Sequence, residues 1–285
     1  MKIKKDKIYL VTGASGFLGE ELVGEILTQG GLVRAFSRNE GKLIDLKQKF
    51  PSIEIYSGDV SDSFETKQAC LGVSGIFHLA ASKHVGLAET FPRECTKTNV
   101  VGSMNILEES LLIRPEFVIG ISTDKAAQVS GVYGASKLLM ERLFSQYENL
   151  NQDTEYRIVR YGNVLYSTGS VLCKWRTLFE SGLEVVVTDP SATRFFWTRQ
   201  QAVELIFSCL ENSKNSSPWV PFMKAMSIGD LLDALARKYL PEDCQLKIRT
   251  IGLQPGENKH EKILEEGPFS NEVDRFTVEE IMELI

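Results

Sequence analysis

The strongest constraint on the fold is a short strand, a glycine-rich loop and a helix that follow one another near the N-terminus. A β-rich run from Lys7 to Thr12 leads directly into the loop, and a helical pattern continues to about Gln29. Glycines let a backbone turn tightly and approach a pyrophosphate, whose charge is stabilised by the amides at a helix N-terminus. This order favours a dinucleotide site over a plain structural turn. The loop residues expected to contact the ligand are Gly13, Ser15, Gly16, Phe17, Leu18 and Gly19.

Strand and helix patterns then alternate through the first half of the chain. Further strands are expected at Leu32–Phe36, Ile53–Tyr56, Gly75–Leu79 and Phe117–Ile121, and one long helix over Glu89–Ser110. Short connections between them imply right-handed crossovers and a parallel sheet covered on both faces. The predicted fold class is therefore α/β, a Rossmann-type doubly wound sheet. Such sheets bind ligands beyond the carboxyl ends of their strands.

The tip of the second strand indicates which dinucleotide binds. An NAD site usually carries an acid there that bonds the ribose 2′-hydroxyl, whereas a 2′-phosphate needs an arginine or another donor. This chain has Ser37, Arg38 and Lys42 and no acid at the tip. We therefore expect NADP rather than NAD, with a solvated basic loop as the alternative. Contacts from the other strand ends are expected at Asp59, Val60, Leu79, Ala80, Ala81, Lys83, Ser122 and Val164.

A second group of reactive side chains follows the fifth strand. Its members are Ser122, Thr123, Asp124, Lys125, Tyr133 and Lys137. Tyr133 opens a helical pattern, and residues four apart share a helix face, so the Lys137 ammonium is expected beside the Tyr133 phenol. A nearby cation lowers a phenol pKa from about 10, which would make Tyr133 a base near neutral pH. The alternatives are a surface Tyr–Lys pair and, for Asp124 and Lys125, a surface ion pair.

The pattern becomes shorter and more mixed in the second half. We expect residues 1–162 to form the NADP-binding Rossmann domain, and residues 163–285 a smaller α/β substrate-binding cap that can return part of its chain to the sheet. Helices are expected at Val171–Ser181, Gln200–Asn212 and Ser227–Leu240.

Composition excludes several other classes of protein. The chain has 285 residues, 43% hydrophobic and 25% charged, and its net charge of −6 gives no basic footprint for nucleic acid. No apolar run approaches the roughly 20 residues that span a bilayer, and the N-terminus enters a strand directly, so a cytoplasmic location without a membrane partner is expected. Five cysteines without a CxxC pair and three histidines without ligand spacing predict no metal site.

Six motifs together resemble the extended short-chain dehydrogenase/reductase family. They are TGASGFLG, GDV, HLAASKHV, STDKAA, YGASK and RYGNV. Their order and spacing are most similar to the inverting UDP-N-acetylglucosamine 4,6-dehydratases of bacterial polysaccharide and nonulosonic-acid biosynthesis, from the N-terminus to about Glu261. STDKAA is the discriminating motif. Dehydratases that retain the C5 configuration have Asp-Glu where this chain has Asp124 and Lys125, and 4-epimerases generally lack both groups. The chain departs from the family where it reads YSTGS instead of GSRGS, and where Gln254 replaces an arginine.

The resemblance implies a reaction with no net redox change. Tyr133, supported by Lys137 and Thr123, would accept the C4 hydroxyl proton of the sugar while NADP accepts hydride. Lys125, if neutral, would remove the acidified C5 hydrogen, and Asp124 would protonate the departing C6 hydroxyl. Return of hydride to C6 would give a UDP-4-keto-6-deoxy sugar, with inversion at C5 if the proton returns from the opposite face.

The resemblance also implies nucleotide contacts and self-association. UDP would be held by Lys83, Asn163, Arg194 and Glu257. For Arg194 the alternative is an ion pair with Asp189, and for Glu257 the start of a helix. A homo-oligomer, dimer or hexamer, is expected by analogy with the family.

Two other functions stay open at the level of the sequence. A nucleotide-sugar 4-epimerase or 4-ketoreductase would use Tyr133 and Lys137 but would have no role for Lys125. A non-catalytic NADP-sensing regulatory protein would need only the glycine loop and Arg38.

Overall fold

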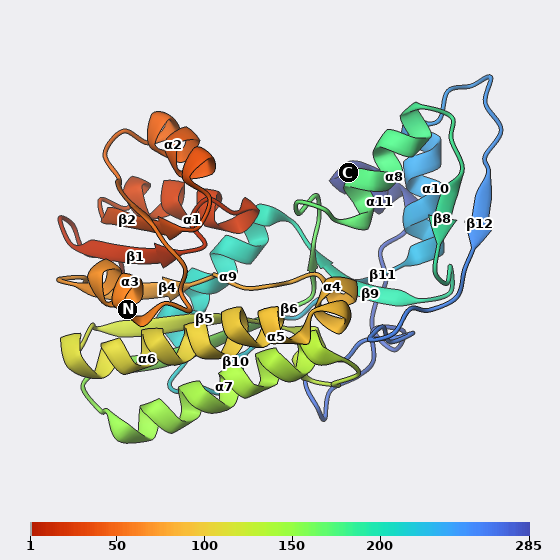
Figure 1. Cartoon of the computed structure of the whole chain (residues 1–285). Coiled ribbons are helices and arrows are strands. Elements are labelled where there is room, and N and C mark those ends of the chain that lie inside the picture. Colours follow the sequence, from red (N-terminus) through yellow and green to blue (C-terminus); the bar gives the residue numbers. More distant parts are fainter. Residues whose placement is uncertain (1) are drawn as a thin grey trace.

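A seven-stranded parallel sheet forms the centre of the molecule. The computed structural model describes residues 2–285. The strands lie in the order β10-β6-β5-β4-β1-β2-β3, as Figure 1 shows. Their bounds are β1 Ile8–Thr12, β2 Leu32–Ser37, β3 Glu54–Ser57, β4 Gly75–His78, β5 Phe117–Thr123, β6 Glu155–Tyr161 and β10 Pro218–Trp219. The predicted Rossmann-type doubly wound sheet is confirmed, and strands β1 to β5 differ from their expected ranges by one or two residues.

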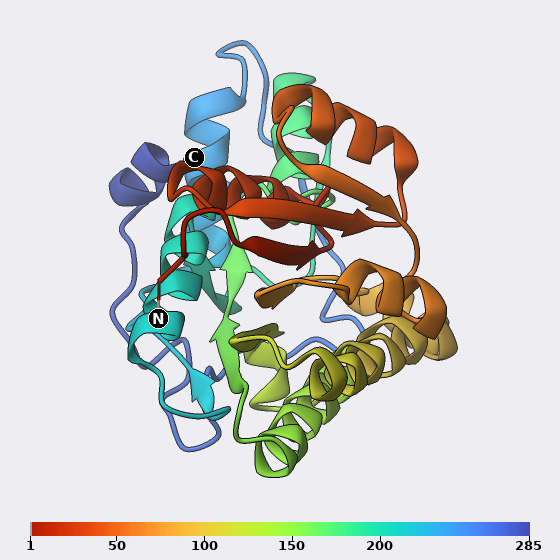
Figure 2. The same ribbon diagram turned by 90° about the vertical axis from the view of Figure 1, so that its left-hand side faces the viewer.

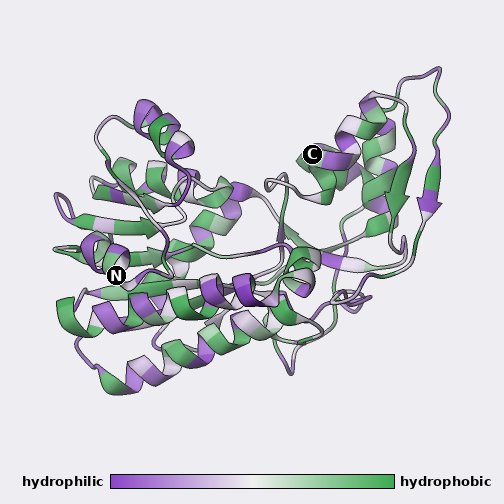
Figure 3. Cartoon of the chain, viewed as in Figure 1, coloured by the Kyte–Doolittle hydropathy of each residue, from purple (hydrophilic) through white to green (hydrophobic). Residues whose placement is uncertain are grey.

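Helices cover both faces of this sheet because successive strand residues point to opposite sides. In β1, Tyr9 and Val11 pack into one apolar cluster with helices α1 (Phe17–Thr28), α2 (Glu40–Lys49) and α9 (Arg199–Asn212). Leu10 packs into the opposite cluster with α3 (Ser63–Cys70), α6 (Gly102–Ile113) and α7 (Val132–Leu150). Figure 2 shows α6 and α7 side by side beneath the sheet. In Figure 3 the strands of the sheet are mainly apolar, whereas polar and apolar residues alternate along these two helices.

The prediction of a single helix over Glu89–Ser110 is wrong. The segment is divided into α4 (Val85–Thr90), α5 (Pro92–Thr96), a π-helical turn (Lys97–Val101) and α6. Pro92 lacks a backbone N–H and begins a new helix at its first position. The π turn contains buried Asn99, whose amide accepts a hydrogen bond from the Ser82 N–H at 2.7 Å and donates one to the Ser82 carbonyl at 3.0 Å. Asn99 therefore fixes the loop after β4.

A smaller lobe packs beside the end of the sheet (Figure 1). It contains α8 (Val171–Glu180), α10 (Ile228–Tyr239) and α11 (Val278–Leu284) around one apolar cluster. Its strands are β7 Asn163–Val164, β9 Thr193–Trp197 and β11 Ala225–Ser227 in one small sheet, and β8 Val185–Val187 and β12 Ile248–Thr250 in another. Ser227 caps α10, as expected, by accepting a hydrogen bond from the Asp230 N–H.

Two connections join this lobe to the large sheet. Helix α9 and strand β10 come from the second half of the chain, yet α9 packs against α1 and β10 pairs with β6. Strand β9 contributes Phe195 to the core of the large sheet and Phe196 to the core of the smaller lobe. The two lobes are therefore joined by buried side chains as well as by the backbone.

Candidate functional site

The glycine loop lies at the carboxyl end of β1, where backbone segments come very close together. Gly13 has a φ of +68°, and a Cβ on it would lie 2.9 Å from the Ala80 backbone nitrogen. A Cβ on Gly19 would lie 2.7 Å from the Ala14 carbonyl oxygen. Helix α1 begins after Gly16 without a side-chain cap, which leaves amides of its first turn available for an anion. Side chains would fill this cradle, so the loop fits the pyrophosphate of a dinucleotide.

A cavity of about 710 Å³ opens beside this loop and runs toward the smaller lobe. It brings together most of the residues that the sequence predicted for the site. The predicted residues that line it are Gly13, Ser15, Gly16, Phe17, Leu18, Gly19, Ser37, Arg38, Lys42, Val60, Leu79, Ala80, Ala81, Lys83, Ser122, Thr123, Lys125, Tyr133, Lys137, Asn163 and Val164. The predicted residues outside its lining are Asp59, Asp124, Arg194 and Glu257.

The basic group at the tip of β2 faces this cavity. The Arg38 guanidinium is 62% exposed and lies 3.5 Å from a carboxylate oxygen of Asp59. Burial tends to raise the pKa of Asp59, but hydrogen bonds from Ser61 and the charge of Arg38 lower it overall. Ser37 is hydrogen bonded to Ser15 of the glycine loop at 2.7 Å. Asp59, which was expected to contact the cofactor, therefore contacts Arg38 and does not line the cavity.

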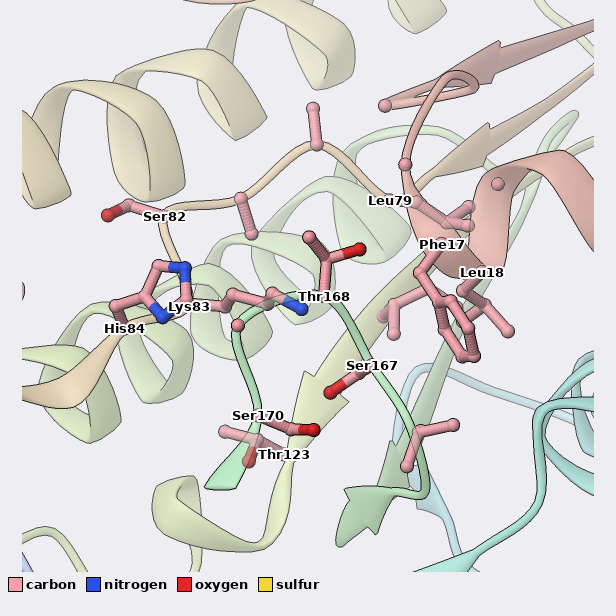
Figure 4. Close-up of a pocket in the computed structure, with 18 of the residues that line it drawn as sticks. Phe17, Leu18, Leu79, Ser82, Lys83, His84, Thr123, Ser167, Thr168 and Ser170 are labelled. Carbon is pink, nitrogen blue, oxygen red and sulfur yellow. The ribbon is translucent and has the colours of Figure 1, made fainter. Parts of the chain in front are cut away.

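The loop after β4 and the segment before α8 meet across the cavity. Figure 4 shows Lys83 and His84 facing the hydroxyl-bearing segment that carries Ser167, Thr168 and Ser170. Burial lowers the pKa values of Lys83 and His84. Of these residues only Lys83 was predicted, although the YSTGS segment was visible in the sequence. The missed lining residues here are Ser82, His84, Ser167, Thr168 and Ser170.

The acid–base pair after β5 is buried rather than on the surface. The Asp124 side chain is fully buried and that of Lys125 is 15% exposed, with 3.2 Å between Lys125 Nζ and Asp124 Oδ1. Thr123 Oγ1 donates a hydrogen bond to the same Asp124 oxygen at 2.8 Å. The alternative of a surface ion pair is therefore wrong. The other carboxylate oxygen of Asp124 has no hydrogen-bond partner among the described residues.

Lys125 is held as a cation, which differs from the expectation of a neutral base. Burial lowers its pKa, but the carboxylates of Asp124 and Glu261 outweigh burial and raise the pKa above the ordinary value. Glu261 lies 3.5 Å from Lys125 Nζ and is itself buried. Glu261, the last residue of the PGENKHE segment, was not among the residues predicted for the site.

Tyr133 and Lys137 both line the cavity, but they do not interact as the helix spacing suggested. Burial raises the pKa of Tyr133 to about 12, while the charge of Lys125 and a hydrogen bond with Thr123 act to lower it. Burial also lowers the pKa of Lys137 to about 8, and its Nζ lies 3.3 Å from Met140 Sδ. The expected lowering of the Tyr133 pKa by Lys137 is therefore wrong for this structure, where Lys125 is the cation acting on the phenol.

Two of the predicted nucleotide contacts from the smaller lobe, Arg194 and Glu257, lie behind or beside the cavity. Arg194 is buried; its Nη1 donates hydrogen bonds to the Thr193 and Lys259 carbonyls, and its Nε lies 3.8 Å from Glu261. Its ionic partner is therefore Glu261 and not Asp189. Glu257 accepts a hydrogen bond from the Gln254 N–H in a turn, and no helix begins there.

Comparison with known proteins identifies the family of this chain. A family model described as polysaccharide biosynthesis protein matches residues 9–283. The chain belongs to this polysaccharide biosynthesis family. Relatives in it include an uncharacterized membrane protein of Methanocaldococcus jannaschii, 37% identical over 94% of this chain and 83% of the relative. A UDP-N-acetylglucosamine 4,6-dehydratase (inverting) of Campylobacter jejuni is 33% identical over 90% of this chain and 76% of the relative.

The family also contains relatives with another stated activity. A UDP-glucose 4-epimerase of Rickettsia canadensis is 32% identical over 91% of this chain and 78% of the relative. Among solved structures, Pen from Bacillus thuringiensis has a TM-score of 0.94 and 27% identity, covering 99% of this chain and 98% of that one. The predicted extended short-chain dehydrogenase/reductase family is thus confirmed, and the chain is a member of a nucleotide-sugar dehydratase and epimerase family.

Residues 2–285 also bear on the expectations for a membrane span and a metal site. None of the helices there combines the length and apolar character that a bilayer span requires. Within the same residues, no three His, Cys, Asp or Glu side chains converge as a metal site would require.

Proposed function

We propose that the chain is a nucleotide-sugar 4,6-dehydratase that converts UDP-N-acetylglucosamine into a UDP-4-keto-6-deoxy sugar with inversion at C5. The observation that carries this proposal is the buried pair of Asp124 and Lys125: Lys125 lines the cavity with Tyr133, and Asp124 lies 3.2 Å behind Lys125. Oxidation at C4 needs only Tyr133 and a nicotinamide cofactor. An adjacent acid and base are needed in addition when water is eliminated across C5 and C6.

NADP is the proposed cofactor. Arg38, Ser37 and Lys42 line the cavity beyond β2, where they can bind a 2′-phosphate by charge and hydrogen bonds. The bound nicotinamide would accept hydride from C4 and return it to C6. Lys83, Asn163 and the hydroxyls before α8 face the space that remains for a nucleotide sugar. In this proposal residues 1–162 hold the cofactor, and residues 163–285 supply the far wall of the substrate site.

The protein groups would move two protons during the reaction. Tyr133 takes the proton of the C4 hydroxyl in its phenolate form, which the Lys125 charge and the hydrogen bond with Thr123 favour against burial. In the resting state Lys125 is an ammonium paired with the Asp124 carboxylate, so Lys125 first passes a proton to Asp124 across the 3.2 Å that separate them. The resulting amine takes the C5 hydrogen as a proton, and the neutral acid of Asp124 protonates the C6 oxygen as the C–O bond breaks. One water leaves, and Lys125 is again an ammonium paired with the Asp124 carboxylate. Once hydride has returned to C6, C5 takes up a proton and Tyr133 releases the proton it accepted, so the sugar has lost one water and the protein groups are back in their starting states.

Product analysis tests the reaction directly. Incubation with UDP-N-acetylglucosamine should give a product that has lost the mass of one water, and its proton NMR spectrum reports the C5 configuration. A product of unchanged mass would instead support a 4-epimerase, which the Rickettsia relative favours. Binding of NADP without any sugar turnover would support the non-catalytic sensor.

The variant Lys125→Ala tests the role of the pair. It should retain bound NADP and lose the dehydrated product, because Lys125 lines the cavity while the glycine loop is unchanged. Lys174→Ala is a matched control, since this lysine stands at the start of α8 and outside the cavity lining. Full turnover by Lys125→Ala would refute the assignment.

A further inference from the structure

Behind the Asp124–Lys125 pair lies a second ion pair that belongs to the smaller lobe. Glu261 Oε1 lies 3.5 Å from Lys125 Nζ and 3.8 Å from Arg194 Nε. The side chains of Asp124, Glu261 and Arg194 are at most 9% exposed, and that of Lys125 is 15% exposed. Two carboxylates and two cations thus form one cluster that is largely buried from solvent. Their formal charges sum to zero when all four are ionised.

The Glu261 carboxylate is fixed by contacts on several sides. Asn258 Nδ2 donates to Glu261 Oε2 at 3.2 Å, and the same amide donates to the Gln128 carbonyl at 3.2 Å, in the loop that follows Lys125. The Glu261 N–H donates to Ser270 Oγ at 2.9 Å. The segment 258–261 therefore attaches the smaller lobe to the loop that carries the acid–base pair.

We propose that Glu261 is a positioning residue for the dehydration: it holds Lys125 beside Asp124 and balances the charge of Arg194. This inference rests on the proposed function. When a proton passes from Lys125 to Asp124, both become neutral, and Glu261 and Arg194 remain paired with each other. The site therefore stays neutral in both proton arrangements. Without Glu261, the buried Arg194 cation would have no carboxylate beside it and would repel the charge on Lys125.

Charged and titratable groups reach Lys125 from four elements. Asp124 lies on the same turn, Tyr133 on α7, Arg194 on β9 and Glu261 on the C-terminal segment. Asp124 and Glu261 favour the ammonium form, whereas burial and Arg194 oppose it. Replacing Glu261 by glutamine removes one of the two favourable charges and keeps the size of the side chain. The pKa of Lys125 should then fall by about 1–3 units, as expected for the loss of a close opposite charge.

An NMR titration of the full-length protein tests this without relying on turnover. Lysine labelled with 13C at Cε reports the charge of each side chain, and Lys125→Arg assigns the Lys125 signal. We expect the wild-type signal to stay charged to at least pH 10, and the Glu261→Gln signal to titrate lower by the stated amount. Glu266→Gln is the control, because Glu266 is exposed and five residues away.

Two further variants separate charge balance from simple structural damage. The double variant Glu261→Gln with Arg194→Met removes one charge of each sign, so the Lys125 titration should return toward the wild-type value. Glu261→Asp keeps the carboxylate charge but places it farther from Lys125. The pKa of Lys125 should therefore fall less in Glu261→Asp than in Glu261→Gln. This variant also decides the question if Glu261→Gln does not fold. A Lys125 titration that is unchanged in Glu261→Asp and Glu261→Gln, or lowest in the double variant, would overturn the proposal.

Turnover adds a separate readout. A pair that loses its shared proton has no acid for the C6 hydroxyl. As the pH rises, Glu261→Gln should therefore lose product formation at a lower pH than the wild type, by the same amount as its Lys125 titration is lowered. Tyr133 and Lys137 are present in every variant, so their ionisation affects all profiles alike. If the wild type forms no dehydrated product, the proposed function fails while the NMR titration still decides the role of Glu261. Parallel pH profiles together with a normal titration would refute both steps of the reasoning.

Discussion

A pair of identical substitutions in helix α1 isolates the effect of close packing at the glycine loop. Gly19→Ala places a Cβ against backbone, 2.7 Å from the Ala14 oxygen and 2.8 Å from its Cα, and still closer to the Gly13 oxygen. Gly24→Ala, in the same helix, places a Cβ 3.3 Å from the tip of the Phe50 ring, a side chain that can move slightly. Both changes gain about 1 kcal/mol of helix propensity at most. That gain cancels when the two variants are compared.

The structure sets the size of the difference. Relieving the overlap with the Ala14 oxygen alone needs a backbone displacement of about 0.7 Å, from 2.7 Å to an ordinary contact of 3.4 Å, and relieving that with the closer Gly13 oxygen needs a larger one. Overpacking of this kind costs about 1–3 kcal/mol. With roughly 2–4 °C per kcal/mol for a chain of this size class, Gly19→Ala should melt roughly 2–12 °C below Gly24→Ala.

Thermal melting and NADP titration measure the two consequences separately. The displaced loop should also weaken NADP binding in Gly19→Ala, because the first-turn amides of α1 move relative to the pyrophosphate. Gly24→Ala should bind NADP as the wild type does, since Gly24 lies a turn and a half from the loop. Equal melting temperatures and equal NADP affinities in the two variants would show that the close backbone approach at Gly19 has no energetic consequence.

Three further predictions follow from the site and its supports. Arg38→Ala should weaken NADP binding about tenfold or more and leave NAD binding nearly unchanged, since a charged hydrogen bond contributes about 1.5–3 kcal/mol; equal losses for both dinucleotides in a titration would contradict the NADP assignment. Asn99→Leu should lower the free energy of unfolding by about 1–3 kcal/mol, because both backbone groups of Ser82 lose their partner, and an unchanged urea midpoint would show that water replaces it. Burial, with a contribution from Lys137, lowers the pKa of His78 from 6.5 to about 3 in the folded state, so the unfolded chain binds its proton first and stability should fall as the pH drops below about 6.5. His78→Asn should reduce that fall in urea titrations at pH 7.5 and 5.5, and identical slopes would exclude His78 as its cause.

The parts of this molecule that follow local rules were predictable from the sequence. Strand β1, the glycine loop and α1 depend on neighbouring residues, and so does the cap that Ser227 provides for α10. The interruption by Pro92 was readable in principle, but the π turn around Asn99 depends on a contact with Ser82 across the fold. Periodicity alone therefore predicted one long helix.

The electrostatics of the site could not be predicted from local sequence. The expectation for Lys125 considered only its neighbours, whereas Glu261 reaches it from a segment more than 130 residues away. The expectation for Tyr133 considered the spacing to Lys137 but not burial, which has the largest effect on the phenol. The sequence indicated which groups meet at the strand ends, but their charge states depend on tertiary contacts.

The return of α9 and β10 to the large sheet has a consequence for the order of events during synthesis. β6 ends at Tyr161 and its neighbour β10 ends at Trp219, which is 58 residues later (219 minus 161). Until the ribosome has added these residues, the edge of β6 and the face of the sheet that α9 covers stay exposed. At common elongation rates this takes roughly 3–12 s. During that time the nascent N-terminal half exposes an apolar face and an unpaired strand edge, which makes it a natural client for a chaperone. A fragment that stops at residue 162 would carry the same exposed surface permanently.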